Sequence, residues 1–167
     1  AQLIFLNRTC YNGLFRVNSK GAFNTPAGDY INPSICDLKN LTAASKLLDK
    51  AIIKQVDFTK ALKNVKPSSF VYLDPPYRPL SKTASFTAYS KSIFQDKEQS
   101  QLAGIYRQLD KKGVSLMLSN SDSPDKFFDR LYSGFGITRV PAKRLINADA
   151  SKRGHVNEIV VTNYPVN

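Results

Sequence analysis

One segment of the sequence, Phe70-Val71-Tyr72-Leu73-Asp74-Pro75-Pro76-Tyr77, is the most informative about the fold. Consecutive apolar residues that end at a carboxylate and two prolines are typical of a strand buried on both faces of a parallel sheet. Proline has no backbone N–H to donate to a neighbouring strand, so the strand is expected to end before Pro75. Asp74 is therefore expected at the carboxyl edge of a sheet, where α/β proteins bind their ligands.

The segments on either side of this strand alternate between helical and strand-like patterns. Apolar residues recur at helical spacing over 41–52 and about 96–112, and Ser123-Pro124 opens a further helix. Strand-like runs cover 52–58, 114–119, 137–140 and 158–162. This alternation predicts an α/β fold with a largely parallel sheet covered on both faces. Residues 11–33 carry glycines and prolines at turn spacing, which suits hairpins or irregular loop.

The composition favours a polyanionic partner. The chain of 167 residues has 24 Lys and Arg against 13 Asp and Glu, a net charge of +11, so nucleic acid is expected ahead of an anionic membrane surface. No apolar run approaches the roughly 20 residues of a bilayer span, and we expect a soluble, cytoplasmic protein with no membrane partner. Two cysteines and one histidine predict neither a disulfide framework nor a metal site.

Three residues of the segment suit the chemistry of an aromatic amine. The Asp74 carboxylate can accept a hydrogen bond from an amino group, the Pro75 carbonyl can point outward, and the Tyr77 ring can stack on a base. The amino nitrogen of adenine is a poor nucleophile because its lone pair is delocalised into the ring. Two acceptors that hold its N–H groups out of the ring plane would relocalise that lone pair. The alternative is that Asp74-Pro75-Pro76 is only a turn that ends a strand.

Several separated segments resemble Dam-type DNA adenine methyltransferases. The segment 70–77, followed by Pro79-Leu80-Ser81 and Phe86-Thr87-Ala88-Tyr89, is similar to that family's catalytic motif. Residues 11–18 and 21–28 resemble its target-recognition hairpin, and 116–121 and 157–164 its late strands. The similarity covers nearly the whole chain in the family's order, which is far more specific than one tetrapeptide.

This resemblance implies a Rossmann-like methyltransferase sheet, mostly parallel with an antiparallel late strand, plus a target-recognition hairpin. Residues 1–36 would end the target-recognition segment, and 37–167 would form the C-terminal part of the catalytic domain. The implied reaction moves a methyl group from S-adenosylmethionine to the exocyclic 6-amino group of a flipped adenine in double-stranded DNA, at a GATC site. Flipping is required because the amino group is paired inside the duplex.

The resemblance also implies roles for single residues. Asp74, Pro75, Pro76 and Tyr77 would be catalytic: Asp74 and the Pro75 carbonyl hold the amino group, and Tyr77 stacks on the base. Asp57 and Phe58, together with Asp74, would contact S-adenosylmethionine; the Asp57 carboxylate would accept from the adenine amino group of this donor, on whose ring Phe58 would pack. For Asp57 the alternative is a turn carboxylate at the end of a strand.

DNA recognition would belong to the hairpin. Tyr11 would wedge into the base stack, Asn12 would lie beside the orphaned base, Leu14 would touch a thymine methyl, and Arg16 would bind guanine O6 and N7. Further expected DNA-binding residues are Pro26, Lys20, Arg144, Lys152 and Arg153, with Arg139 and Lys143 as additional phosphate candidates. The alternatives are a local hydrophobic patch for Tyr11 and Leu14, and solvated charges for the basic residues.

The sequence lacks a motif that the family carries N-terminal to its recognition hairpin. The family's glycine-rich cofactor loop is not found, and the one Gly-x-Gly, Gly134-Phe135-Gly136, precedes a predicted strand. We therefore expect the C-terminal portion of a longer enzyme, incomplete at its N-terminus, or a chain that pairs with a separate N-terminal chain, with little activity by itself. Two functional alternatives stay open: a cytosine amino-methyltransferase, and a DNA-binding fragment without catalysis. Cys36 follows Ile35 rather than proline, which argues against covalent attack on cytosine.

Overall fold

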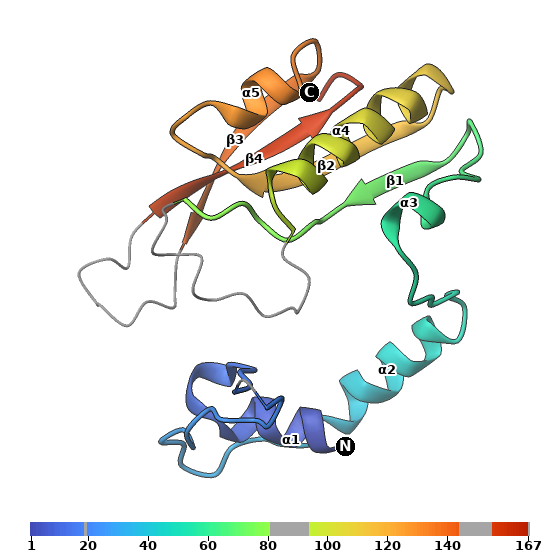
Figure 1. Ribbon diagram of the computed structural model, residues 1–167. Helices are drawn as coiled ribbons and strands as arrows, with labels where there is room; N and C mark the ends of the chain where they lie inside the picture. Colours follow the sequence, from blue (N-terminus) through green and yellow to red (C-terminus); the bar gives the residue numbers. More distant parts are fainter. Residues whose placement is uncertain (19, 81–93, 144–154, 167) are drawn as a thin grey trace. The chain divides into compact units, whose positions relative to one another are not determined.

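The computed structural model describes residues 1–18, 20–80, 94–143 and 155–166, which form two compact units (Figure 1). The first unit is Ala1–Gln55 and the second is Val56–Asn167. Three of the expected DNA-binding residues, Arg144, Lys152 and Arg153, lie outside the described residues, as does the expected motif segment 86–89. None of the described helices is both long enough and apolar enough to span a membrane.

The second unit is built on a four-stranded sheet. Its strands are β1 (Phe70–Leu73), β2 (Ser115–Ser121), β3 (Gly136–Lys143) and β4 (His155–Thr162), in the order β1-β2-β4-β3. β1 and β2 are parallel, and β4 runs antiparallel to both β2 and β3. Three strands thus share one direction and β4 opposes them, which confirms the predicted α/β fold with an antiparallel late strand.

Two helices cover the same face of this sheet (Figure 1). They are α4 (Asp96–Lys111), which leads from β1 to β2, and α5 (Phe127–Leu131), which leads from β2 to β3. Right-handed crossovers that progress in one direction across a sheet place their helices on one side. On the other face, Phe70 and Tyr72 of β1 are 59% and 52% exposed. Within the described residues, the predicted cover on both faces is therefore wrong.

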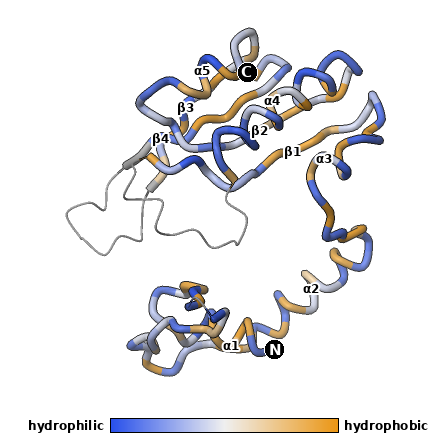
Figure 2. Tube along the Cα trace, in the orientation of Figure 1, coloured by the Kyte–Doolittle hydropathy of each residue, from blue (hydrophilic) through white to orange (hydrophobic). Residues whose placement is uncertain are grey.

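The core lies between these helices and the sheet. Apolar stretches follow the strands in Figure 2, and the inward side chains of β2 and β4 are fully buried. The buried residues of α4 and α5 meet them, and the Tyr106 and Tyr132 rings pack edge to face at 5.2 Å. The core consists of Leu62, Leu73, Leu102, Ala103, Tyr106, Leu109, Val114, Leu116, Leu118, Phe128, Tyr132, Ile159 and Val161.

The ends of α4 follow from its sequence. Gln95 and Glu98 form a reciprocal capping box at the N-terminus, which supplies partners for backbone N–H groups that the helix leaves free. After the C-terminus, Gly113 has a φ of +77°, a conformation that costs glycine little. The helix predicted over about 96–112 is thus confirmed. Its buried face positions the N-terminal turn close to the segment that follows β1.

The first unit contains α1 (Gln2–Thr9), the short 3-10 helix η1 (Tyr11–Gly13) and α2 (Leu38–Leu48). Between η1 and α2 the chain forms a small hairpin, in which Val17 pairs antiparallel with Phe23. Its backbone bonds run from Asn18 N to the Ala22 carbonyl at 2.9 Å and from Asn24 N to the Arg16 carbonyl at 3.0 Å. The predicted hairpin is therefore present, and α2 is the helix predicted over 41–52, shifted toward the N-terminus.

The strand predicted over 52–58 is wrong. Residues 52–57 have no regular secondary structure, and Asp57 caps the short helix α3 (Phe58–Ala61). A strand needs a neighbour to satisfy its backbone N–H and C=O groups, and no described strand lies beside this segment. Ile52 and Ile53 are accordingly 86% and 76% exposed.

Candidate active site

Asp74 directly follows β1 at the carboxyl end of the strand. Because Leu73 pairs with Leu118 in register, Asp74 lies beside Ser119 of β2. The Ser119 hydroxyl donates to Asp74 Oδ1 at 2.9 Å, and the same hydroxyl lies 2.9 Å from the Tyr72 hydroxyl. Asp74 itself is exposed, whereas Ser119 is buried. The carboxylate is therefore available at the edge of the sheet and fixed on one side.

Tyr77 lies close to this carboxylate and is held at its hydroxyl. The ring is 38% exposed, and its OH donates a long hydrogen bond of 3.4 Å to Glu158 Oε2 on β4. Partial burial raises the pKa of Tyr77 above 10, and the negative charges of Glu158 and Asp74 act in the same direction. The phenol is therefore neutral at physiological pH, and part of its surface is open to a ligand.

A buried amide network fixes the backbone after Pro75. Gln99 Nε2 on α4 donates to the Pro76 carbonyl at 3.0 Å, and Arg78 N donates to Asn120 Oδ1 at 3.0 Å. Ser121 Oγ donates to the Arg78 carbonyl at 2.6 Å. These three side chains are buried. Side chains of α4 and β2 together therefore fix the backbone conformation from Pro76 to Arg78.

Arg78 ties this segment to two further carboxylates. Its guanidinium donates to both oxygens of Asp96, at 2.7 and 3.0 Å, and to Asp125 at 2.9 and 3.1 Å. The guanidinium also lies 4.4 Å from the centre of the Phe127 ring. The hydrogen bond to Asp96 raises the pKa of Arg78 above its ordinary value. Arg78 thus joins the start of α4 to the region that leads into α5.

Asp57 and Phe58, the expected contacts to S-adenosylmethionine, lie at the start of α3. Asp57 Oδ1 accepts from Thr59 N at 2.9 Å and from the Thr59 hydroxyl, which lowers the pKa of Asp57. Its other oxygen accepts no hydrogen bond from the described residues. The half-buried Phe58 ring packs against Phe94 at 5.6 Å. This pair retains a free carboxylate oxygen and an aromatic surface, which fit an adenine amino group and ring.

The expected base-reading residues come together in the hairpin region of the first unit. Tyr11 and Asn12 are exposed on η1, with Asn12 in the left-handed region at a φ of 52°. Leu14 is half-buried, and its carbonyl accepts from the Thr25 hydroxyl at 2.8 Å. The carbonyl of the exposed Pro26 accepts from Tyr11 N at 2.9 Å. The exposed Lys20 lies in the turn of the hairpin.

Arg16 is held across the hairpin rather than free in solvent. Its Nε donates to Asn24 Oδ1 at 3.1 Å, and its Nη2 donates to the Asn24 carbonyl at 2.9 Å. In the second unit, Arg139 is also engaged, since it donates to Asp122 at 3.1 Å and to both oxygens of Asp129. Arg139 is therefore a less suitable phosphate ligand than its position in the sequence indicates.

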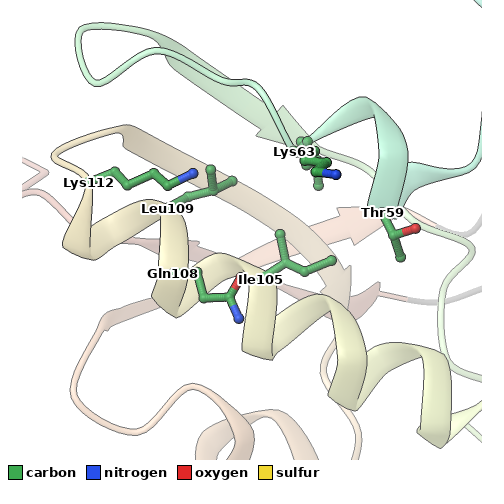
Figure 3. A pocket seen from close by; sticks show the side chains of 7 residues that line it. Thr59, Lys63, Ile105, Gln108, Leu109 and Lys112 are labelled. Atoms are coloured by element: carbon green, nitrogen blue, oxygen red, sulfur yellow. The ribbon is translucent and has the colours of Figure 1, made fainter.

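A pocket of about 180 Å³ lies beside α4 (Figure 3). It is formed between α3 with the residues just after it and the C-terminal half of α4, and it is lined by Thr59, Leu62, Lys63, Ile105, Gln108, Leu109 and Lys112. None of these residues belongs to the segment 74–77. The candidate site is defined by the side chains at the sheet edge and not by this pocket.

Sequence reasoning missed the residues that support the motif. Sequence patterns assign no role to Ser119, Asn120, Gln99 or Glu158, although they predict the strands that carry three of them. One signal was available, because three consecutive polar residues, Ser119-Asn120-Ser121, end an otherwise apolar strand. At the carboxyl edge of a parallel pair, such residues lie beside those that end the neighbouring strand.

The fold and this edge define an α/β protein with an exposed carboxylate and a partly exposed tyrosine after the carboxyl end of a parallel strand. A model of the D12 class N6 adenine-specific DNA methyltransferase family matches residues 1–146. The chain therefore belongs to that family, which confirms the family resemblance found in the sequence.

Curated relatives carry corresponding names. Type II methyltransferase M.MjaIII of Methanocaldococcus jannaschii is 54% identical over 165 residues, covering 98% of this chain and 57% of the relative. Type II methyltransferase M1.LlaDCHI of Lactococcus lactis subsp. cremoris is 45% identical over 166 residues, covering 98% and 58%. A DNA adenine methylase of Vibrio cholerae is 34% identical over 158 residues, covering 94% and 56%. The chain thus spans a little over half the length of these relatives.

Proposed function

We propose that the protein acts as a DNA adenine methyltransferase that modifies the 6-amino group of adenine. The main support is the position of Asp74, whose exposed carboxylate follows a parallel strand at the carboxyl edge and is fixed on one oxygen by Ser119. Membership of an adenine-specific family adds the substrate class. A second support is the rigid backbone around Pro76 and Arg78, which would keep the acceptors in place.

The proposed reaction depends on two acceptors and one aromatic surface. Asp74 and the Pro75 carbonyl would each accept one N–H of the amino group, so that the nitrogen becomes tetrahedral and its lone pair points toward the methyl group. The Tyr77 ring would stack on the flipped base, which must leave the duplex to reach this edge. The nitrogen would form its new bond to the methyl carbon as the carbon–sulfur bond breaks and a neutral thioether leaves, and the methylated nitrogen would then lose one proton to solvent. No proton has to be removed before the attack, so alignment and acceptor electrostatics would supply most of the acceleration.

The proposed methyl donor is S-adenosylmethionine. When bound, it supplies a methyl group on a positively charged sulfur, which needs no further activation. The free oxygen of Asp57 would accept from its adenine amino group, and Phe58 would pack on its ring, with Asp74 nearby in the donor site. Because Thr59 already fixes the other oxygen of Asp57, the free oxygen has a defined direction.

The proposed target is a GATC site, and the hairpin would read it. Arg16 would donate to guanine O6 and N7 and Leu14 would contact a thymine methyl, while Tyr11 and Asn12 occupy the space beside the flipped base. The net charge of +11 supports binding to the phosphate backbone. Binding should therefore weaken steeply with salt, as counterions are released on association.

The experiment that tests this proposal uses the full-length protein that carries these residues. Labelled methyl groups are transferred from S-adenosylmethionine to duplexes with and without GATC, and the modified nucleosides are then identified. Methylated adenine in GATC duplexes supports the proposal. Methylated cytosine would instead establish the cytosine alternative, and DNA binding without S-adenosylmethionine binding would indicate a binding module.

A matched pair of variants tests the role of Asp74. Asp74→Ala should abolish methyl transfer while DNA binding is retained, because the carboxylate acts on the flipped base alone. Asp49→Asn, at the exposed C-terminus of α2 in the first unit, should leave transfer unchanged. Normal turnover in Asp74→Ala would reject the assignment of Asp74.

A further inference from the structure

Ser119 occupies a special position in the second unit. It lies on β2 at the point where β1 ends, and it is only 6% exposed. Its hydroxyl oxygen lies 2.9 Å from Asp74 Oδ1 and 2.9 Å from the Tyr72 hydroxyl oxygen. The side chain therefore connects the Asp74 carboxylate to a phenol on the neighbouring strand.

The number of hydrogens fixes the direction of both bonds. The Ser119 hydroxyl donates its single hydrogen to Asp74 Oδ1. Towards the Tyr72 hydroxyl, 2.9 Å away, the Ser119 oxygen can then only accept, so Tyr72 donates to Ser119. The result is one directed chain from Tyr72 through Ser119 to Asp74.

This chain of hydrogen bonds restricts the rotation of the Asp74 carboxylate. Asp74 is exposed, and a terminal carboxylate torsion is broad, so an unsupported carboxylate would sample many orientations. With Oδ1 held by Ser119, the plane of the carboxylate is set and Oδ2 is the oxygen left for a ligand. Acceptors that act on a transition state must be held in a defined direction before the reaction occurs.

We propose that Ser119 is a positioning residue for methyl transfer, which orients the Asp74 carboxylate toward the amino group, and that Tyr72 in turn orients the Ser119 hydroxyl. This inference rests on the proposed function of the site. It adds two residues of the strands β1 and β2 to the machinery, neither of which contacts the reacting atoms.

The test measures single-turnover methyl transfer and the Kd for DNA in the full-length protein. Ser119→Ala should lower the rate constant about tenfold and leave the Kd for DNA unchanged, because the lost bond is to a charged group that acts only after binding. Ser119→Thr keeps the hydroxyl on a strand residue and should restore most of the rate. Ser115→Ala, on the exposed start of the same strand, serves as the matched control and should behave like the wild type.

Tyr72→Phe gives a second, independent arm. The ring is half exposed on the uncovered face, so loss of its hydroxyl should not affect folding, which thermal unfolding can verify. Tyr72→Phe alone should lower the rate constant less than Ser119→Ala does. In the double variant, Tyr72→Phe should cause no further loss of rate, because both substitutions break the same chain of hydrogen bonds.

Four outcomes would overturn the inference. A rate for Ser119→Ala within about twofold of an active wild type would remove Ser119 from the machinery and leave the proposed function intact. The inference would also be overturned if Ser119→Thr did not restore the rate that Ser119→Ala loses. It would equally be overturned if Tyr72→Phe lowered the rate further in the Ser119→Ala background. A wild-type protein that methylates no adenine would overturn the proposed function and this inference with it.

Discussion

The side-chain amides of Gln99 and Asn120 meet inside the second unit, where Asn120 Nδ2 donates to Gln99 Oε1 at 3.3 Å. Each of them also holds one backbone atom of the segment after Asp74-Pro75, Gln99 at the Pro76 carbonyl and Asn120 at Arg78 N. Both side chains are fully buried. Helix α4 and strand β2 therefore set the conformation of the motif jointly, through a pair of uncharged residues.

We expect Gln99→Leu to destabilise the second unit by about 1–3 kcal/mol, because it leaves the buried Asn120 Nδ2 without a partner and removes the donor to the Pro76 carbonyl. Methyl transfer should fall as well, since the backbone beside the acceptors is released. Urea unfolding and single-turnover transfer would measure the two effects.

The matched control is Gln101→Leu, two residues along the same helix and exposed. It should change the free energy of unfolding by less than about 0.5 kcal/mol. An equal loss in both variants would mean that the Gln99 hydrogen bonds contribute nothing specific.

Local sequence patterns were sufficient to predict several parts of this fold. The short continuous apolar run before Asp74 indicates a strand, the helical spacing of apolar residues over 96–112 indicates a helix, and both elements are present. The position of Asp74 at the carboxyl edge follows from the same reasoning, since parallel strands end at one edge. The hairpin was indicated by its glycines and prolines.

The parts that sequence reasoning missed depend on neighbours distant in the chain. Residues 52–58 have a strand-like pattern, but a strand forms only where another strand can pair with it, and no described strand does so. The contact of Gln99 with the Pro76 carbonyl joins residues 23 positions apart. No periodicity shows such a contact, because it depends on how α4 packs against the sheet.

The hold of Asn24 on Arg16 leads to a prediction about sequence preference. Arg16→Ala should cost about 1–3 kcal/mol of discrimination at one guanine, because a bidentate donor to O6 and N7 is lost. Asn24→Ala removes the side-chain acceptor of Arg16 Nε but keeps the backbone carbonyl that accepts from Nη2, so the guanidinium is held less firmly and a smaller loss at the same guanine is expected. Binding to duplexes altered one base pair at a time would measure both.

Lys20→Ala is the control for this series. Lys20 is an exposed lysine in the turn of the hairpin. If it contacts phosphate, its removal should weaken DNA binding to all sequences alike and reduce the salt dependence of that binding. If Arg16→Ala also weakened binding uniformly, Arg16 would be a phosphate contact and the hairpin would not read guanine through it.

The ion pair between Arg139 and Asp129 predicts a dependence of stability on pH. Hydrogen bonding to Arg139 lowers the pKa of Asp129 below 3.8. A carboxyl with a lowered pKa in the folded state stabilises the fold above about pH 4 and ceases to do so as the pH falls through the lowered value. Arg139→Gln should therefore reduce the free energy of unfolding at pH 7, and the difference from the wild type should shrink near pH 3.

Urea unfolding of both proteins at these two pH values would check this expectation. A difference that is equal at pH 3 and pH 7 would show that Arg139 stabilises the unit by packing rather than by its charge. High salt at pH 7 should also reduce the difference, because both side chains are partly exposed.

Tyr106 and Tyr132 pack against each other in the core but differ at their hydroxyls. The Tyr106 OH donates to the Leu116 carbonyl at 3.2 Å and lies 3.4 Å from the Val161 carbonyl, whereas the Tyr132 OH has no partner among the described residues. Tyr106→Phe should therefore lower the free energy of unfolding by about 1 kcal/mol, while Tyr132→Phe should leave it unchanged or raise it by up to about 1 kcal/mol.

Burial raises the pKa of both phenols, so each is held neutral in the folded state. A phenol whose pKa is raised in the folded state contributes to the free energy of unfolding. This contribution is complete below the ordinary pKa near 10 and is lost as the pH rises above it. Each phenylalanine variant should therefore lose less stability than the wild type between about pH 9 and pH 11. Urea unfolding across this range measures both effects in the same samples. Equal destabilisation by the two substitutions at pH 7 would contradict the difference in hydrogen bonding, because the ring packing that they preserve is the same.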